Sequence, residues 1–220
     1  VCSSDLDLDK AVEGALASKF RNAGQTCVCA NRLYIQDGVY DRFAEKLQQA
    51  VSKLQIGDGL QPNVTIGPLI DEKAIAKVQE HIADALDKGA RVATGGKPHE
   101  LGGNFFQPTI LVDVPSDAKV AKEETFGPLA PLFRFKDEAD VIAQANDTEF
   151  GLAAYFYARD LGRVFRVGEA LEYGIIGINT GLISTEVAPF GGVKSSGLGR
   201  EGSKYGIEDY LEIKYMCIGI

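Results

Sequence analysis

Cys27 is placed where a thiol could act as a nucleophile. Upstream of it, apolar residues repeat at three- and four-residue steps over residues 11–20, the period of one helical face, and Asn22 and Gly24 then interrupt that pattern. Downstream, residues 33–35 are typical of a short strand. We therefore expect Cys27 on a tight turn between a helix and a strand, where backbone N–H groups can stabilise the reactive thiolate. Because a free cysteine is more often a small buried hydrophobe, the spacing alone leaves both interpretations open.

Three further motifs follow the loop Gly24-Gln25-Thr26-Cys27 along the chain. They are Glu-Glu-Thr-Phe-Gly-Pro at 123–128, Asn-Thr-Gly at 179–181 and Pro-Phe-Gly-Gly-Val-Lys-Ser-Ser-Gly-Leu-Gly-Arg-Glu at 189–201. In type and order, the four motifs together resemble those of the aldehyde dehydrogenase family. The resemblance covers about residues 7–220 and is highly specific, but it extends only to the C-terminal part of that family.

The resemblance implies a reaction in which Cys27 is the catalytic nucleophile. Its thiolate would attack an aldehyde carbonyl, and its own backbone N–H would help to hold the resulting oxyanion. The thiohemiacetal would then pass a hydride to a cofactor, NAD or NADP, leaving a thioester that water hydrolyses to the acid.

Glu124 and Phe126 match the family positions that contact the nicotinamide ribose. A carboxylate can accept hydrogen bonds from two ribose hydroxyls, and a ring can pack beside the sugar and the nicotinamide. By residue type alone, the alternative is a surface acid before a core phenylalanine. Glu123, the neighbouring acid, is expected to face away from the cofactor.

Arg21 and Ser184 are the residues that would recognise the substrate. The run 20–29, together with Gly-Leu-Ile-Ser at 181–184, resembles specifically the succinate-semialdehyde dehydrogenases of that family, in which the matching Arg and Ser bind the distal carboxylate of the substrate. A guanidinium fork and a hydroxyl are suitable donors to a carboxylate. Phe190 matches a position that lines the aldehyde pocket. By residue type alone, the alternatives are a solvated cation at a helix end, a serine in a turn and a core phenylalanine.

Cys29 lies two residues beyond the nucleophile. In relatives with this Cys-x-Cys arrangement, the pair can form a disulfide that switches activity off under oxidation, so the resemblance makes Cys29 a possible redox partner of Cys27. So small a ring would be strained. A silent packing residue is the equally weighted alternative.

The elements around these motifs alternate between helix and strand. This alternation predicts an α/β fold, the aldehyde dehydrogenase catalytic domain, with a mostly parallel sheet covered by helices. Helices are predicted over 39–54, after a cap at Asp71, over the segment containing Val141 and Ala145, and over 161–171. Strands are predicted at 33–35, 91–94, 108–112, 132–135, 153–157 and 175–178.

The last part of the chain is rich in glycine and then apolar. Residues 181–206 are predicted to be irregular, and Gly-Gly-Val-Lys-Ser-Ser-Gly at 191–197 lacks the spacing of a phosphate-binding P-loop. Residues 210–218 are predicted to form a strand that pairs with an edge of its own sheet or of another subunit. Because the corresponding tail of the family belongs to the oligomerisation surface, we expect a homo-oligomer, either a dimer or a tetramer.

Composition excludes several classes of partner. The net charge of −8, spread along the chain, argues against nucleic acid and anionic membranes. No apolar run approaches the length of a membrane span, and no signal peptide is recognisable. Four cysteines and two histidines form neither a secreted disulfide framework nor a zinc pattern, so we expect no metal and a cytoplasmic location.

The organisation predicted from the sequence has three parts. Residues 1–6 read as a non-native start, 7–206 as the catalytic domain with its glycine-rich connecting stretch, and 207–220 as the oligomerisation tail. The N-terminal dinucleotide-binding domain of the family is expected to be absent from this chain. Because the family places the water-activating Glu and most cofactor contacts there, we expect the isolated 220 residues to have no appreciable dehydrogenase turnover.

The implied activity is NAD(P)-dependent oxidation of succinate semialdehyde to succinate, in GABA degradation. Two alternatives stay open. Glutarate semialdehyde or another aldehyde acid is one of them, since an Arg and a Ser recognise a carboxylate without measuring chain length. A non-catalytic assembly module is the other.

Overall fold

The structure is a computed structural model that describes residue 1 and residues 5–220. Half of the predicted non-native start, residues 2–4, therefore lies outside the described residues. The helices are α1 (Leu8–Phe20), α2 (Tyr40–Val51), α3 (Glu72–Asp87), α4 (Lys119–Lys122), α5 (Glu138–Asn146) and α6 (Leu161–Ala170), with short 3₁₀ turns η1 (Arg21–Gly24), η2 (Asp37–Val39) and η3 (Glu208–Tyr210). The strands are β1 (Leu33–Gln36), β2 (Arg91–Thr94), β3 (Thr109–Val112), β4 (Leu129–Phe135), β5 (Phe150–Gly151), β6 (Ala153–Phe156), β7 (Ile175–Ile178) and β8 (Val193–Lys194).

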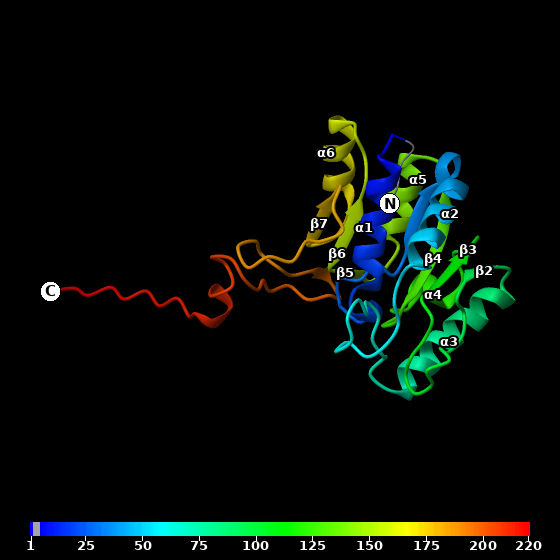
Figure 1. The fold of residues 1–220 in the computed structure, drawn as a ribbon. Coiled ribbons are helices and arrows are strands. Elements are labelled where there is room, and N and C mark those ends of the chain that lie inside the picture. The colour runs from blue at the N-terminus through cyan, green and yellow to red at the C-terminus, as the bar shows by residue number, and fades with distance from the viewer. Residues whose placement is uncertain (2–4) are drawn as a thin grey trace.

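A four-stranded sheet with the order β1-β4-β3-β2 forms the centre of the molecule (Figure 1). β1 and β3 both run parallel to β4, with Leu33 opposite Leu132 and Ile110 opposite Ala130, whereas β2 pairs antiparallel to β3. Every residue of β3 is buried, as expected for a strand covered on both faces. The mixed, mainly parallel sheet confirms the predicted α/β fold.

A capping side chain and a glycine mark the two ends of α3. The Asp71 carboxylate accepts a hydrogen bond from Ala74 N at 2.8 Å and caps α3, as predicted, and Gly89 follows that helix with a φ of +101°. Predicted bounds were wrong by a few residues for α2, which ends at Val51 rather than Leu54. Leu86, an apolar residue near the end of α3, is 40% exposed.

A second group of strands stands apart from the central sheet. β6 and β7 form a parallel pair, and β5 pairs antiparallel with β8. β8 interrupts the glycine-rich stretch that was predicted to be irregular throughout. Within the described residues, neither pair is hydrogen-bonded to β1, so the predicted elements do not merge into a single continuous sheet.

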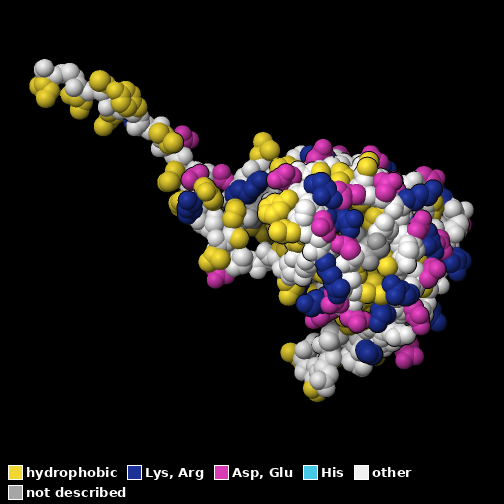
Figure 2. Space-filling view, turned by 90° about the horizontal axis from the view of Figure 1, so that it is seen from above, with side chains coloured by type: hydrophobic (Ala, Val, Ile, Leu, Met, Phe, Trp, Pro, Cys, Tyr) yellow, Lys and Arg dark blue, Asp and Glu magenta, His cyan; other side chains and the backbone are white. Residues whose placement is uncertain are grey.

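The C-terminal tail departs from its prediction. Residues 211–220 have no regular secondary structure and extend away from the domain (Figure 1), so the predicted strand over 210–218 is not formed. Ile213 and Tyr215 are 100% and 86% exposed, and Figure 2 shows apolar side chains along the whole tail. The physical reason is that a strand needs a partner strand, and this single chain brings no sheet edge to the tail.

The described residues at the start of the chain contact the domain. Asp5 accepts hydrogen bonds from the backbone N–H groups of Arg159 and Asp160 at 3.1 and 3.0 Å, and Leu6 packs against the core. No helix in the described part of the chain is both long enough and apolar enough to cross a membrane.

Candidate active site

The turn that carries Cys27 is built from an unusual backbone. Asn22, Ala23 and Gly24 have positive φ angles of 51°, 55° and 76°, which end α1 and reverse the chain. A Cβ atom on Gly24 would lie 2.0 Å from the carbonyl oxygen of Gly127, so only glycine fits. The close approach joins the cysteine loop to the motif at 123–128, two segments a hundred residues apart in the sequence.

The two cysteines of this turn face different surroundings. Cys27 is exposed, whereas Cys29 is buried with 7% of its surface accessible, and both thiols are free. The Cys29 Sγ lies 2.9 Å from the Thr26 hydroxyl and donates to the Arg21 carbonyl oxygen at 3.9 Å. The turn thus presents Cys27 to solvent and holds Cys29 inward.

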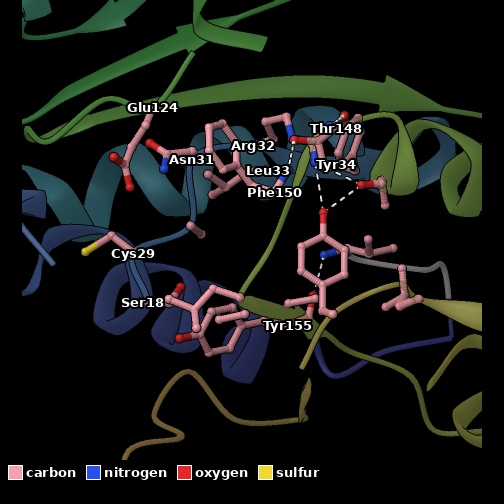
Figure 3. A pocket seen from close by; sticks show the side chains of 18 of the residues that line it. Ser18, Cys29, Asn31, Arg32, Leu33, Tyr34, Glu124, Thr148, Phe150 and Tyr155 are labelled. Carbon is pink, nitrogen blue, oxygen red and sulfur yellow. Dashed lines mark hydrogen bonds between the residues drawn. The ribbon is translucent and has the colours of Figure 1, made fainter. Parts of the chain in front are cut away.

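A cavity of about 370 Å³ opens beside the turn (Figure 3). Cys27, Cys29 and Glu124 all line it, so the structure brings together three of the residues selected from the sequence. Its deeper walls are mostly apolar and come from α1, β1 and β6. They include Ala11, Ala15, Leu33, Tyr34, Ala154 and Tyr155.

The two adjacent glutamates have different surroundings. The Glu123 carboxylate pairs with Lys77 and lies 3.3 Å from His81 Nε2, which lowers its pKa. Glu124 makes no hydrogen bond to any described residue, and in Figure 3 it points toward the side on which Cys29 lies. Partial desolvation raises the pKa of its carboxyl, while the Lys19 ammonium acts in the opposite direction.

The other predicted site residues do not line this cavity. Arg21, Ser184 and Phe126 are exposed, with Phe126 at 41%. Phe190 lines a separate hollow formed by the glycine-rich stretch, and its backbone pairs with Glu201. In this chain, Cys27, Cys29 and Glu124 therefore line one cavity. Arg21 and Ser184, the residues predicted to recognise a carboxylate, lie outside it.

Lys19 is a neighbour of the site that the sequence reasoning missed. Its side chain is fully buried, and its Nζ has no hydrogen-bond partner among the described residues. Burial lowers its pKa to about 8, although Cys29 and Glu124 both act to raise it. The sequence carried a usable signal, because Lys19 falls four and eight residues after Ala15 and Ala11, on the buried face of α1.

Tyr155 on β6 is a second residue that was missed. Its hydroxyl donates to the Val28 carbonyl oxygen at 2.8 Å, between the two cysteines of the turn. Burial raises its pKa, and the charges of Cys29 and Cys27 raise it further, whereas Arg21 lowers it. β6 therefore supports the loop that carries the candidate nucleophile, and nothing in its local sequence indicated this.

The geometry of the site indicates a class of enzyme chemistry. An α/β domain that holds an exposed, free thiol on a glycine-dependent turn, where it lines a cavity together with a carboxylate, is suited to covalent catalysis by cysteine. The chain belongs to the aldehyde dehydrogenase family, whose family model matches residues 1–216.

Individual relatives show which members of the family the chain is similar to. The chain is 89% identical to the succinate-semialdehyde dehydrogenase [NADP(+)] GabD of Escherichia coli K12, over 98% of this chain and 45% of the relative. It is 77% identical to a glutarate-semialdehyde dehydrogenase of Pseudomonas aeruginosa, over 98% of this chain and 44% of the relative. A solved structure described as an E. coli NADP-dependent enzyme is 88% identical, has a TM-score of 0.98, and is matched over 100% of this chain and 46% of its own. The chain thus spans less than half the length of these relatives.

Proposed function

We propose that this chain supplies the nucleophile-bearing part of an NAD(P)-dependent aldehyde dehydrogenase, with Cys27 as the attacking thiolate. The observation that carries the proposal is the arrangement of the turn, in which Cys27 is exposed and lines the cavity while Cys29 is buried. Attack by the Cys27 sulfur on an aldehyde carbon forms a thiohemiacetal on this side chain, and the Cys27 backbone N–H is the candidate donor to the oxyanion.

Glu124 and Phe126 are the residues of this chain that would hold the cofactor, NAD or NADP. The Glu124 carboxylate faces the cavity without a competing hydrogen bond in the described structure, and the Phe126 ring is accessible, so both fit a sugar with vicinal hydroxyls beside a flat ring. When bound, a nicotinamide cofactor supplies the hydride acceptor.

Succinate semialdehyde is the substrate that we favour, with Arg21, Ser184 and Phe190 as the substrate-binding residues. The 89% identity to the E. coli relative supports this choice, while the 77% identity to a glutarate-semialdehyde dehydrogenase keeps the five-carbon homologue as the alternative. Arg21 is exposed and has no side-chain hydrogen bond among the described residues, which leaves its fork available to a carboxylate.

The working enzyme requires more than this chain in our proposal, because its relatives are more than twice as long. We expect the 220 residues alone to produce no measurable NAD(P)H from an aldehyde. The exposed apolar tail at 211–220 supports a homo-oligomer, dimer or tetramer, in which the tail packs on another subunit. We place the enzyme in the cytoplasm.

A hybrid enzyme tests the proposal. The upstream part of the E. coli relative would be joined to this chain, and steady-state turnover would be measured with succinate and glutarate semialdehydes and with each cofactor. We expect Cys27→Ala to abolish turnover and the matched control Cys29→Ala to retain most of it. Undiminished turnover of Cys27→Ala would refute the assignment, and a preference for glutarate semialdehyde would favour the alternative substrate.

A further inference from the structure

His81 is a polar side chain at a core position of α3. Its imidazole is completely buried, and Val78, Ile82 and Ala85 are the other buried residues of the same helix. A buried polar group is destabilising unless it is hydrogen-bonded, so the partners of this ring show what the ring holds in place.

Both ring nitrogens of His81 lie against the motif at 123–128. Nδ1 is 2.7 Å from the Thr125 hydroxyl, and Nε2 is 3.3 Å from a carboxylate oxygen of Glu123. Because a carboxylate only accepts hydrogen bonds, Nε2 carries the proton, and Nδ1 of the neutral ring accepts from the Thr125 hydroxyl. Burial lowers the pKa of His81, which favours this neutral ring, although Glu123 acts in the opposite direction.

The bond to Thr125 is the better protected of the two. Thr125 is 1% exposed, whereas the Glu123 side chain is 44% exposed and also pairs with Lys77, itself 39% exposed. Exposed charge pairs contribute little because water screens them. The buried contact between His81 and Thr125 is therefore the main attachment of this segment to α3.

The two residues that bond to the His81 ring stand on either side of Glu124. The backbone of Glu123 is extended, with φ −99° and ψ 145°. In an extended chain, successive side chains point to opposite sides. Since Glu123 and Thr125 both point toward α3, Glu124 points away from α3, and it lines the cavity.

A second contact holds the same segment from the side of the cysteine turn. The Thr125 N–H donates to the Asn31 Oδ1 at 3.0 Å, and Asn31, two residues beyond Cys29, also lines the cavity. Figure 3 shows Asn31 and Glu124 next to one another. The segment is thus fixed between α3 and the chain that follows the candidate nucleophile.

We propose that His81 is a positioning residue for Glu124: its ring fixes the residues on both sides of this glutamate, so that the carboxylate faces the cavity. The inference rests on the proposed function, in which Glu124 holds the cofactor. His81 itself does not line the cavity, so its effect on the cofactor passes through Glu124.

Hydrogen exchange in this chain tests whether His81 fixes the segment. His81→Phe removes both ring nitrogens and keeps a planar ring, and Ile82→Val perturbs the same buried helix without removing a hydrogen bond. We expect the Thr125 amide to exchange at least about tenfold faster in His81→Phe, relative to the amides of β3, and to change little in Ile82→Val. An acceleration of the same size at Thr125 and in β3 would show a general loss of stability and would overturn the proposal.

Thr125→Val is the second variant, and it covers the case in which His81→Phe does not fold. It removes only the hydroxyl that bonds to His81 Nδ1, and the amide at position 125 should again lose protection relative to β3. Unchanged protection at this amide would overturn the proposal.

Cofactor affinity in the hybrid enzyme tests whether the effect passes through Glu124. The dissociation constant of NADPH would be measured by fluorescence titration for His81→Phe, Glu124→Gln and the double variant. We expect His81→Phe to raise this constant about tenfold in the parent and to add nothing in the Glu124→Gln background. An equal rise in both backgrounds would overturn the proposal.

His81→Asn is the conservative variant in the same titration. Its side-chain oxygen can replace Nδ1 as the acceptor for Thr125, so it should restore most of the affinity that His81→Phe loses. If Glu124→Gln binds NADPH as tightly as the parent, that result counts against the proposed function alone, and the exchange experiment still decides whether His81 holds the segment.

Discussion

Burial of Lys19 makes the stability of this chain depend on pH in a specific direction. Its pKa falls from 10.5 to about 8 in the folded protein, because burial desolvates the ammonium group, and its amine has no hydrogen-bond partner among the described residues. Between these two values the unfolded chain binds more protons than the folded chain, so the free energy of unfolding rises with pH through this window. A pKa change of this size corresponds to roughly 3 kcal/mol.

The substitution Lys19→Met removes the charge and keeps an unbranched side chain of similar length. We expect the variant to be more stable than the parent by roughly 3 kcal/mol below pH 8, where the parent buries an ammonium group. The advantage should shrink toward zero as the pH rises from 8 to 10.5, because the unfolded lysine then also loses its proton and folding no longer has to remove it.

Urea denaturation of both proteins, at pH values below 8 and between 8 and 10.5, measures this difference. Burial raises the pKa of tyrosines such as Tyr40, so ionisation of these tyrosines lowers the free energy of unfolding of both proteins at high pH. The difference between the two free energies of unfolding, plotted against pH, therefore reports on Lys19. Lys10→Met, an exposed position on the same helix, is the matched control and should change stability little. A Lys19→Met variant that is no more stable than the parent below pH 8 would refute the reasoning.

Three other perturbations test the architecture of the site. Gly24→Ala should destabilise the chain by at least about 2 kcal/mol in denaturant titrations, because Gly24 has a positive φ and lies against the Gly127 carbonyl. The control Gly38→Ala should cost far less, because the space around Gly38 is open. Equal costs for the two substitutions would contradict the packing argument. Tyr155→Phe should cost about 1 kcal/mol and change the rate at which iodoacetamide alkylates Cys27, since the Val28 carbonyl loses its donor; an unchanged alkylation rate would separate β6 from the turn. Peroxide treatment should produce a Cys27–Cys29 disulfide, detected as the loss of two hydrogens by peptide mass spectrometry, and two free thiols after treatment would exclude the redox pairing.

Much of the site was predictable because its parts are local. The tight turn after α1 follows from Asn22 and Gly24, which interrupt the helical period within a few adjacent residues. Arg21 and Ser184 were selected from the family resemblance, and both are exposed outside the cavity, because the folded positions of two loops far apart in the sequence are not set by local residues.

The sequence by itself determined the helices, the buried strands and the turn that carries Cys27, because helical period, capping side chains and glycine dihedrals act over a few residues. Tertiary structure alone decided three things. It left the buried Lys19 amine without a hydrogen-bond partner among the described residues, it placed the Tyr155 hydroxyl against the Val28 carbonyl, and it left residues 211–220 without a strand. Each of these depends on which distant surface arrives opposite a residue, and such long-range pairing leaves no periodic signal in the local sequence.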